Sequence, residues 1–266
     1  MKVVSRPSHE RGNADHGWLK TFHTFSFAMY QKADHDSFGC LRVINEDRVD
    51  PNTGFGTHGH REFEIFSYLV DGELEHQDSM GNLEVLKRGD LQMTSAGTGI
   101  RHSEKCHGPK QVHFLQIWSI PSTRGLQPKY FTRHFSDEEK REGWVRVVAP
   151  ADAEGVVEER EASGPAPVHS PLSLYATIFP AGASRTHIFP TQVAGAVRKA
   201  YIHVIQRSGY NPGRASGATV KISGKDGEEK ELREGDGAYL MGEPGEELKV
   251  ENVGDREAEV LLFDVE

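Results

Sequence analysis

Two short pairs of side chains have the residue types and the spacing of a metal site. His58 and His60 are separated by one glycine, and His102 and Glu104 are separated by one serine. On a β-strand, residues two positions apart project from the same face, so each pair would present both side chains to one side of its strand. If both strands belong to one barrel, four ligand-type side chains converge on its interior.

Three imidazoles and one carboxylate form a ligand set that suits a first-row transition metal such as iron. Such a set leaves coordination positions open for water, dioxygen or a chelating substrate. Zinc, manganese, copper, nickel and cobalt also accept nitrogen and oxygen donors. The residues therefore predict a metal more firmly than they predict iron.

Short alternating or β-branched runs, separated by turn residues, dominate the chain. Examples are GCLRVINED, FEIFSYLVDGELEHQDSMGN, VHFLQIWSI and SLYATIF. Turn signals every ~8–12 residues are typical of a β-sandwich or barrel, so we expect an all-β protein. One short helix is predicted over 136–143, because Ser136 can cap it, Glu139 follows three residues later and a glycine closes it. The Pro-, Ala- and Glu-rich residues 151–171 are predicted to form an exposed connection.

The two halves of the chain resemble each other, which indicates two related domains. The segments Lys87-Arg-Gly-Asp90 and Arg233-Glu-Gly-Asp236 are both tight-turn sequences that lead into an apolar strand. We therefore expect one domain over residues 1–140 and a second over residues 141–266.

The second half keeps one of the four ligand types. Aligned on the Gly-Asp turns, the residues that occupy the four ligand positions there are His187, Phe189, Leu248 and Val250. A single histidine does not make a metal site. We therefore predict the metal in the first domain and none in the second.

The charge balance limits the classes of partner. The 266 residues include 31 Lys+Arg and 40 Asp+Glu, for a net charge of −9, whereas nucleic-acid affinity depends on clustered Lys and Arg. We expect no direct nucleic-acid binding, whereas a basic protein partner is compatible with this charge.

No apolar run reaches the ~18 residues of a membrane span, and no signal-peptide core is visible. Two cysteines fit a reducing compartment. We expect an intracellular, cytoplasmic monomer, with a nuclear location also compatible.

The first half of the chain resembles the pirin family of the cupin superfamily. The resemblance rests on the segments HGHREFEIFSYL from His58, HQDSMGN from His76 and MTSAGTGIRHSE from Met93. The segment HGWLKTFHTFSF from His16 is similar to pirins too, particularly to the quercetinase-like branch. Pirins contain two cupin (RmlC-like jelly-roll) β-barrels in one chain, with one metal site in the N-terminal barrel. The resemblance thus implies that fold here, and it implies as ligands of iron His58, His60, His102 and Glu104.

The same resemblance implies two functions of different kinds. The first is an iron-dependent dioxygenase similar to quercetin 2,3-dioxygenase. Its flavonol, or a similar chelating phenolic substrate, would bind with dioxygen at the open metal positions, and Glu104 would be the base that takes a hydroxyl proton. The alternative is a redox-sensing iron protein that binds a transcription factor, as resemblance to nuclear pirins implies.

Three further side chains could belong to the site. Glu64 stands where many other cupins have a carboxylate ligand, but pirins use the position of Glu104, so we expect Glu64 beside the ligands rather than among them. Glu62 departs from the glycine usual in pirin-like sequences, and it either points toward the site or is turned away by a bulge. Gln116 could line the pocket or pack in the core.

The remaining polar residues of the region are predicted to have structural roles. His76 and Asp78 fall at a predicted turn and are explained by turn chemistry. His113 has the opposite strand parity to Gln116, so we expect it outside the site. Cys106 shares the parity of Glu104, yet we favour a buried bystander over a thiol that approaches the metal or senses redox state.

Overall fold

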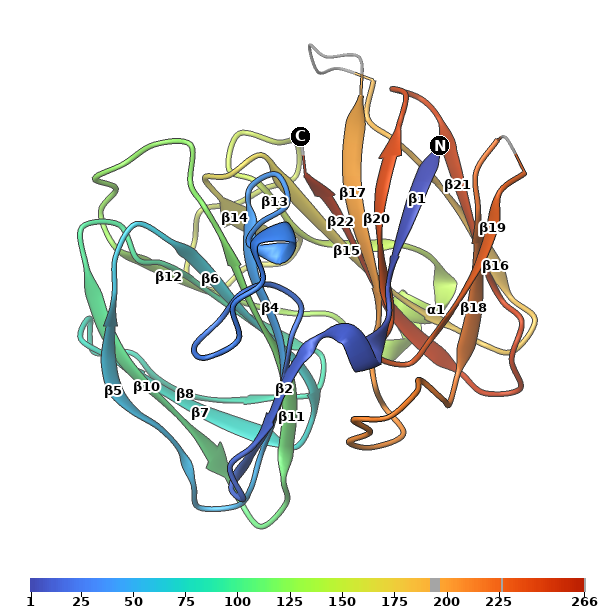
Figure 1. Ribbon diagram of the computed structural model, residues 1–266. Helices are drawn as coiled ribbons and strands as arrows, with labels where there is room; N and C mark the ends of the chain where they lie inside the picture. Colours follow the sequence, from blue (N-terminus) through green and yellow to red (C-terminus); the bar gives the residue numbers. More distant parts are fainter. Residues whose placement is uncertain (192–196, 226, 266) are drawn as a thin grey trace. The chain divides into compact units, whose positions relative to one another are not determined.

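The computed structural model describes residues 1–191, 197–225 and 227–265. Nearly all of its regular structure is antiparallel β-sheet, which confirms the predicted all-β class. The chain divides into two compact units, drawn in Figure 1. The N-terminal barrel consists of residues 12–135 and 147–171, and the C-terminal barrel consists of residues 1–11, 136–146 and 172–266.

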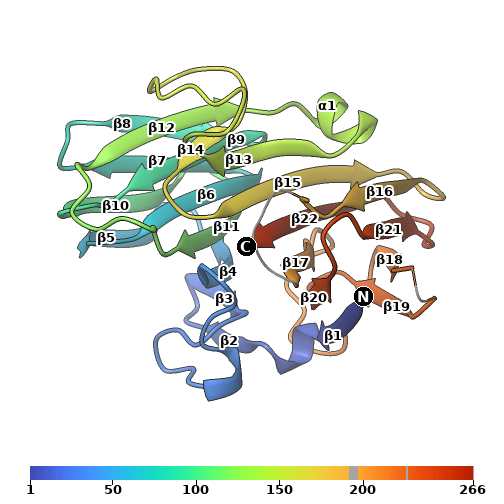
Figure 2. The same ribbon diagram turned by 90° about the horizontal axis from the view of Figure 1, so that it is seen from above.

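The N-terminal barrel is built from two sheets, whose strands Figure 2 shows from above. The larger, seven-stranded sheet has the order β12-β9-β6-β11-β4-β3-β2. Its strands are β2 (Gly12–Asp15), β3 (Leu19–His23), β4 (Leu41–Val49), β6 (Glu64–Asp71), β9 (Asp90–Ser95), β11 (Val112–Ser119) and β12 (Lys129–His134). The smaller sheet has the order β5-β10-β7-β8, and its strands are β5 (Gly54–His60), β7 (Glu73–Asp78), β8 (Leu83–Lys87) and β10 (Ile100–His107).

Two short strands complete this part of the chain. β13 (Val145–Pro150) and β14 (Ala166–Val168) pair in parallel. All three residues of β14 are buried, so the prediction of an exposed connection over 151–171 is wrong for its last part. The short apolar run is buried because it pairs as a strand, and the prolines around it hid that strand from the sequence pattern.

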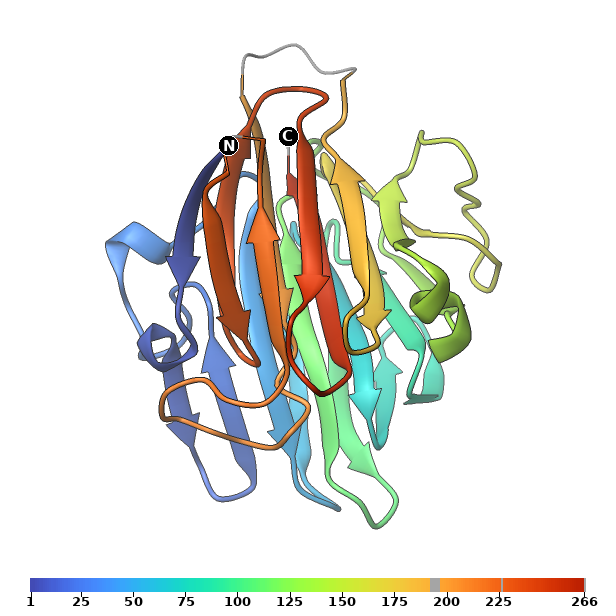
Figure 3. The ribbon, with the colours of Figure 1, turned by 90° about the vertical axis from the view of Figure 1, so that its right-hand side faces the viewer.

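The C-terminal barrel repeats the arrangement of its counterpart. Its larger sheet contains the strands β1-β20-β17-β22-β15 in this order, and the smaller sheet, in front in Figure 3, has the order β16-β21-β18-β19. The bounds are β1 (Lys2–Arg6), β15 (Leu172–Phe179), β16 (Ser184–Ile188), β17 (Arg198–Val204), β18 (Thr219–Ser223), β19 (Glu229–Arg233), β20 (Gly237–Gly242), β21 (Glu247–Asn252) and β22 (Ala258–Val265).

The predicted Gly-Asp turns are present in both barrels. The backbone N–H of Lys87 donates to Asp90 and that of Arg233 donates to Asp236, each over 2.9 Å. The glycine inside each turn has a φ of +88° or +86°, a conformation that residues with a Cβ rarely adopt. The internal repeat therefore extends from sequence to backbone geometry.

The pairing of β1 explains why the first residues of the chain belong to the C-terminal barrel. β1 is hydrogen-bonded to β20 and takes the edge position that β12 occupies in the N-terminal barrel. Residues 1–11 consequently belong to the C-terminal barrel, whereas residues 147–171 belong to the N-terminal barrel. The compact units thus differ from the predicted division into 1–140 and 141–266 at residues 1–11, 136–140 and 147–171.

The predicted short helix is confirmed as α1 (Asp137–Glu142). The Ser136 hydroxyl accepts a hydrogen bond from the backbone N–H of Glu139, whose carboxylate accepts one from the backbone N–H of Ser136. Two 3-10 helices, η1 (Ser8–Glu10) and η2 (Ala33–His35), are shorter still. In the described ranges, no helix has the length and apolar character needed to cross a bilayer.

Aliphatic and aromatic side chains fill the C-terminal barrel at the positions aligned with the ligands. The register pairs His187 with Leu248, as it pairs His58 with His102 in the other barrel. Leu248, Val250 and Phe189 are buried in one apolar cluster. This half of the repeat has exchanged ligand-type residues for packing.

We expect Leu248→Ala to lower the free energy of unfolding by roughly 2–5 kcal/mol, because it leaves a cavity in a close-packed core. Urea denaturation measures this change. Lys249→Ala, at the exposed neighbouring position, is the matched control and should change the value by less than about 0.5 kcal/mol. Equal effects of the two substitutions would contradict the assignment of Leu248 to the core.

Candidate metal centre

The register of the small sheet brings the predicted ligand positions together. β10 lies between β5 and β7, and His102 is paired with His58 on one side and with Asp78 on the other. Between His102 and Glu104 the register against β5 shifts, so that Phe55 lies opposite Glu104. A β-bulge of this kind adds one residue to a strand and changes the direction of the side chains that follow.

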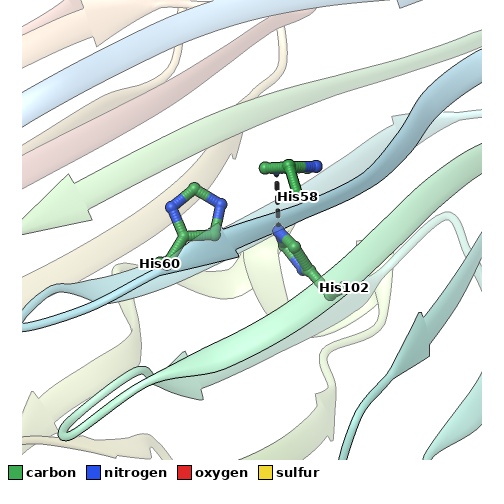
Figure 4. A group of neighbouring side chains, drawn as sticks. All are labelled: His58, His60 and His102. Carbon is green, nitrogen blue, oxygen red and sulfur yellow. Dashed lines mark hydrogen bonds between the residues drawn. The ribbon is translucent and has the colours of Figure 1, made fainter.

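Three imidazole rings form the centre of the site, as Figure 4 shows. The ring centroids of His58, His60 and His102 lie 4.6–4.8 Å from one another. The Nε2 atoms of His58 and His102 are 3.2 Å apart. His102 is buried and the other two are half-buried, so the group has an accessible side.

The environment keeps these rings suitable as ligands, because a metal binds the neutral imidazole. Burial, together with the neighbouring histidines, lowers the pKa of His60 to about 4 and that of His102 to about 3. The Nδ1 atom of His58 lies 2.8 Å from the carbonyl oxygen of Gly56. A carbonyl only accepts, so Nδ1 carries the proton and Nε2 keeps its lone pair.

Glu104 is buried and held by two donors. The Ser67 hydroxyl donates to one carboxylate oxygen over 3.0 Å, and the Gln116 amide donates to the other over 2.8 Å. These bonds fix the orientation of the carboxylate. Ser67 was not predicted, although its signal is simple: it lies opposite Gln116 in the register of β6 and β11. Gln116 takes part in the site through this bond.

The predicted four ligands do not form a single group in the structure. His58, His60 and His102 make one cluster of ligand atoms within 4.8 Å, whereas Glu104 belongs to a second cluster with His102 and His76. His102 is therefore the residue common to both clusters. The assignment of all four residues to one ion stays a prediction.

A second buried carboxylate lies near Glu104. Asp47 on β4 accepts a hydrogen bond from the Thr21 hydroxyl. Burial, with a contribution from the charge of Glu104, raises the pKa of Asp47 to about 7 even though the Thr21 bond opposes the shift. The interior beside the histidines is thus polar and acidic, which favours a cation.

The acidic side chains left open by the sequence have other partners. Glu64 accepts from the Ser95 hydroxyl over 2.6 Å and from the backbone N–H of His169 over 3.2 Å, and it belongs to neither ligand cluster. Glu62 has a φ of +59° and accepts from the backbone N–H of Gly125. A local turn after β5 therefore directs its carboxylate to the loop at Gly125.

Two further residues also lie outside the clusters. The Nε2 atom of buried His113 is 3.1 Å from a Glu46 carboxylate oxygen. The Cys106 thiol is buried among apolar residues and donates to the carbonyl oxygen of Lys110 over 2.9 Å. Burial raises the pKa of this thiol, which makes the thiolate scarcer.

The prediction for His76 and Asp78 is half right. Asp78 accepts from the backbone N–H groups of Met80 and Asn82, as turn chemistry requires. His76, however, lies within β7 and is fully buried, with its ring centroid 5.2 Å from that of His102. The turn prediction was wrong for His76 because the turn begins only after β7 ends, so His76 belongs to the strand.

An open hollow of about 560 Å³ adjoins His60. Its other lining residues are Gly59, Arg61, Ser79, Gly99, Ile100 and Arg101. This volume lies in the range of small-molecule sites, ~300–1,000 Å³. Of the three clustered histidines, His60 is the one that lines this hollow.

Known proteins of similar sequence identify the family of this chain. A family model described as Pirin matches residues 4–119. A quercetin 2,3-dioxygenase of Escherichia coli (strain K12) is 36% identical over 264 residues, covering 99% of this chain and 98% of its own. The chain belongs to the pirin family. A pirin-like protein of Caulobacter vibrioides is 33% identical and covers 82% of this chain and 90% of its own.

Solved structures agree with this membership. The crystal structure of YhhW from Escherichia coli superposes on this pirin-family chain with a TM-score of 0.80 and 33% identity, covering 100% of this chain and 98% of that one. A second crystal structure, of bacterial pirin YhhW in complex with nickel(II), gives a TM-score of 0.78 and covers 99% of both chains. The predicted pirin-type cupin jelly-roll fold is confirmed.

We expect the metal-free protein to lose stability as the pH falls below 6.5. The unfolded chain takes up a proton at His102 there, whereas the folded state, with its pKa lowered to about 3, does not. His60 acts in the same direction, and Asp47, whose pKa is raised to about 7, opposes it. Urea unfolding between about pH 4 and 6, with a chelator present, should show a slope smaller by up to about 1.4 kcal/mol per pH unit in His102→Leu.

The leucine substitution suits the fold, because Leu248 holds the corresponding position of the C-terminal barrel. Parallel curves for the variant and the unaltered protein would contradict a neutral buried His102.

We further expect His60→Ala to abolish stoichiometric metal, because it removes one of the clustered imidazoles. His187→Ala, in the C-terminal barrel, should retain about one ion per chain. Elemental analysis after gel filtration measures both. Loss of the ion from the His187 variant alone would place the site in the other barrel.

Proposed function

We propose that this chain is a metal-dependent dioxygenase of the quercetin 2,3-dioxygenase type, with iron as the metal. Its ligands would be His58, His60, His102 and Glu104. The observation that carries the proposal is the cluster of three imidazoles, beside an oriented carboxylate, in a chain that aligns along 99% of its length with an enzyme of that name.

The residues fit a metal of this class. His58 donates its Nδ1–H to the carbonyl oxygen of Gly56, so its Nε2 has a lone pair for the metal. The lowered pKa values of His60 and His102 keep those two rings neutral. Three nitrogens and a carboxylate oxygen suit iron, and they also suit the nickel named for the Escherichia coli relative. A bound metal would act as a Lewis acid toward a chelating phenol and bring it together with dioxygen.

Glu104 would hold the proton that a flavonol hydroxyl gives up on binding. Ser67 and Gln116 each donate to it, so its carboxylate is oriented before the substrate arrives. Reprotonation of the product by the same carboxyl group would complete the proton balance. This role follows from the position of Glu104 next to His102.

The surroundings of His60 suit an aromatic, anionic ligand. The ring of Trp118 packs edge-on against His60 at 4.8 Å and lies 5.3 Å from Phe63. Aromatic rings of this kind offer a surface for the flat rings of a flavonol. The exposed guanidinium groups of Arg61 and Arg101 line the hollow beside them and would attract a phenolate.

The activity is tested by anaerobic reconstitution with Fe(II), followed by quercetin and air. We expect dioxygen consumption and loss of the flavonol absorbance. Glu104→Gln should lower kcat by about 10²–10⁴-fold, the usual contribution of a general base, and any accompanying loss of metal is measured separately by elemental analysis. His187→Ala is the control with unchanged turnover.

Absence of turnover with Fe, Mn, Co, Ni and Cu alike would contradict the proposed enzyme. In that case the alternative of a redox sensor, which stays a prediction, is tested by comparing partner binding to the ferrous and ferric forms. Elemental analysis of the purified protein distinguishes iron from nickel before any substrate is chosen.

A further inference from the structure

Two buried nitrogen atoms on adjacent rings have no hydrogen-bond partner. They are the Nδ1 atoms of His102 and His76. The two rings have centroids 5.2 Å apart and planes inclined by 65°. Only 1% of His102 and 0% of His76 is exposed, so solvent does not satisfy either atom. Buried polar atoms without partners cost free energy, which makes this pair a feature that needs an explanation.

The proton on His102 must lie on Nδ1 when the ring serves as a ligand through Nε2. Nε2 is the atom that faces His58 at 3.2 Å. A neutral imidazole has one N–H and one lone pair, so a lone pair on Nε2 leaves Nδ1 as a donor. Histidine ligands almost always donate this second N–H to an acceptor. His102 therefore requires an acceptor in the interior of the barrel.

His76 has the complementary state. Its Nε2 lies 3.4 Å from Asp78 Oδ2, and a carboxylate only accepts, so the proton of His76 belongs on Nε2 and the lone pair on Nδ1. Asp78 is itself fixed, because it accepts from Met80 and from both the backbone and the side chain of Asn82. His76 is thus an oriented acceptor next to a donor.

Tyr130 supports His76 from another direction. Its ring packs against His76 with centroids 4.9 Å apart, and its hydroxyl donates to Glu84 over 2.9 Å. The ring of His76 is therefore confined between Tyr130 and His102. A confined ring retains its orientation at low entropic cost.

A separate ion held by His76, His102 and Glu104 is the other interpretation of this cluster. It conflicts with the number of lone pairs. The neutral ring of His102 has one lone pair, on Nε2, which the ion at His58 and His60 would use. One ion with an ordered acceptor behind His102 satisfies every group.

We propose that His76, held by Asp78, is a positioning residue for the metal: its Nδ1 accepts the Nδ1–H of His102 and so fixes the tautomer and ring orientation of that ligand. The proposal rests on the proposed metal site but not on the dioxygenase reaction. The two Nδ1 atoms are not hydrogen-bonded in the metal-free structure, so the proposal requires the rings to turn toward each other when the metal binds. The chain Asp78–His76–His102 would then raise the basicity of the ligand nitrogen.

The test compares two substitutions of His76 that differ in whether they keep an acceptor. His76→Leu removes it, and His76→Asn retains a carbonyl oxygen near the position of Nδ1. Gln77→Leu, at the exposed next position of β7, is the control. Affinity for Zn²⁺ is measured by competition with a chelator, stoichiometry by elemental analysis, and ligand geometry by the visible spectrum of the Co²⁺ form.

We expect about one ion per chain in every variant. His76→Leu should bind Zn²⁺ about 10–100-fold more weakly, with an altered Co²⁺ spectrum, while His76→Asn and Gln77→Leu stay within a few-fold of the unaltered protein. Unchanged affinity in His76→Leu would overturn the proposal. So would two ions in the unaltered protein and one in this variant, which would make His76 a ligand of its own ion.

A measurement on the unaltered protein covers the case in which the leucine variant fails to fold. Nitrogen NMR of the Zn²⁺ form, labelled at histidine, should show His102 protonated at Nδ1 and His76 protonated at Nε2. Protonation of His76 at Nδ1 would overturn the proposal. Failure of the unaltered protein to bind any metal would instead contradict the proposed site itself, and this proposal with it.

Discussion

The burial of His102 is the constraint on which the organisation of the N-terminal barrel depends. β10 is an inner strand of the small sheet, so His102 meets a neighbour from β5 on one side and a neighbour from β7 on the other. Placing an imidazole there, with a carboxylate two residues further on, removes two polar groups from water. Such burial is tolerated only when each group has a partner. Ser67 and Gln116 satisfy Glu104. The buried nitrogen of His102 that faces His58 would find its partner in the proposed cation.

The two barrels show what the same topology does with and without this constraint. The small sheets have equivalent strand orders, and His58 pairs with His102 as His187 pairs with Leu248. In the C-terminal barrel the surrounding interior is a continuous apolar cluster. Its side chains gain free energy by leaving water, at about 25 cal/mol per Å² of apolar surface. The N-terminal barrel forgoes part of that gain in exchange for ligand-type side chains.

Access to the site is asymmetric, and this gives the site its chemical character. His58 and His60 are half-buried, and His60 adjoins a hollow that is also lined by Arg61 and Arg101. On the inner side, His76 and Tyr130 close the cluster. One side of the cluster is therefore more accessible than the other, where buried His76 packs against His102.

The sequence alone determined the all-β class, the repeat, the capped helix, and the two strands that carry His58, His60, His102 and Glu104. These follow from local rules: turn residues, strand parity and capping act over a few neighbouring positions. Only the tertiary structure decided that β1 completes the C-terminal barrel, that β14 is a buried strand, and that Ser67 holds Glu104. It also decided that His76 belongs beside His102 and that Glu62 does not face the cluster. These outcomes depend on which strands become neighbours and on where the register shifts. Pairing between residues far apart in the chain is set by the packing of the whole barrel, and no single segment encodes it.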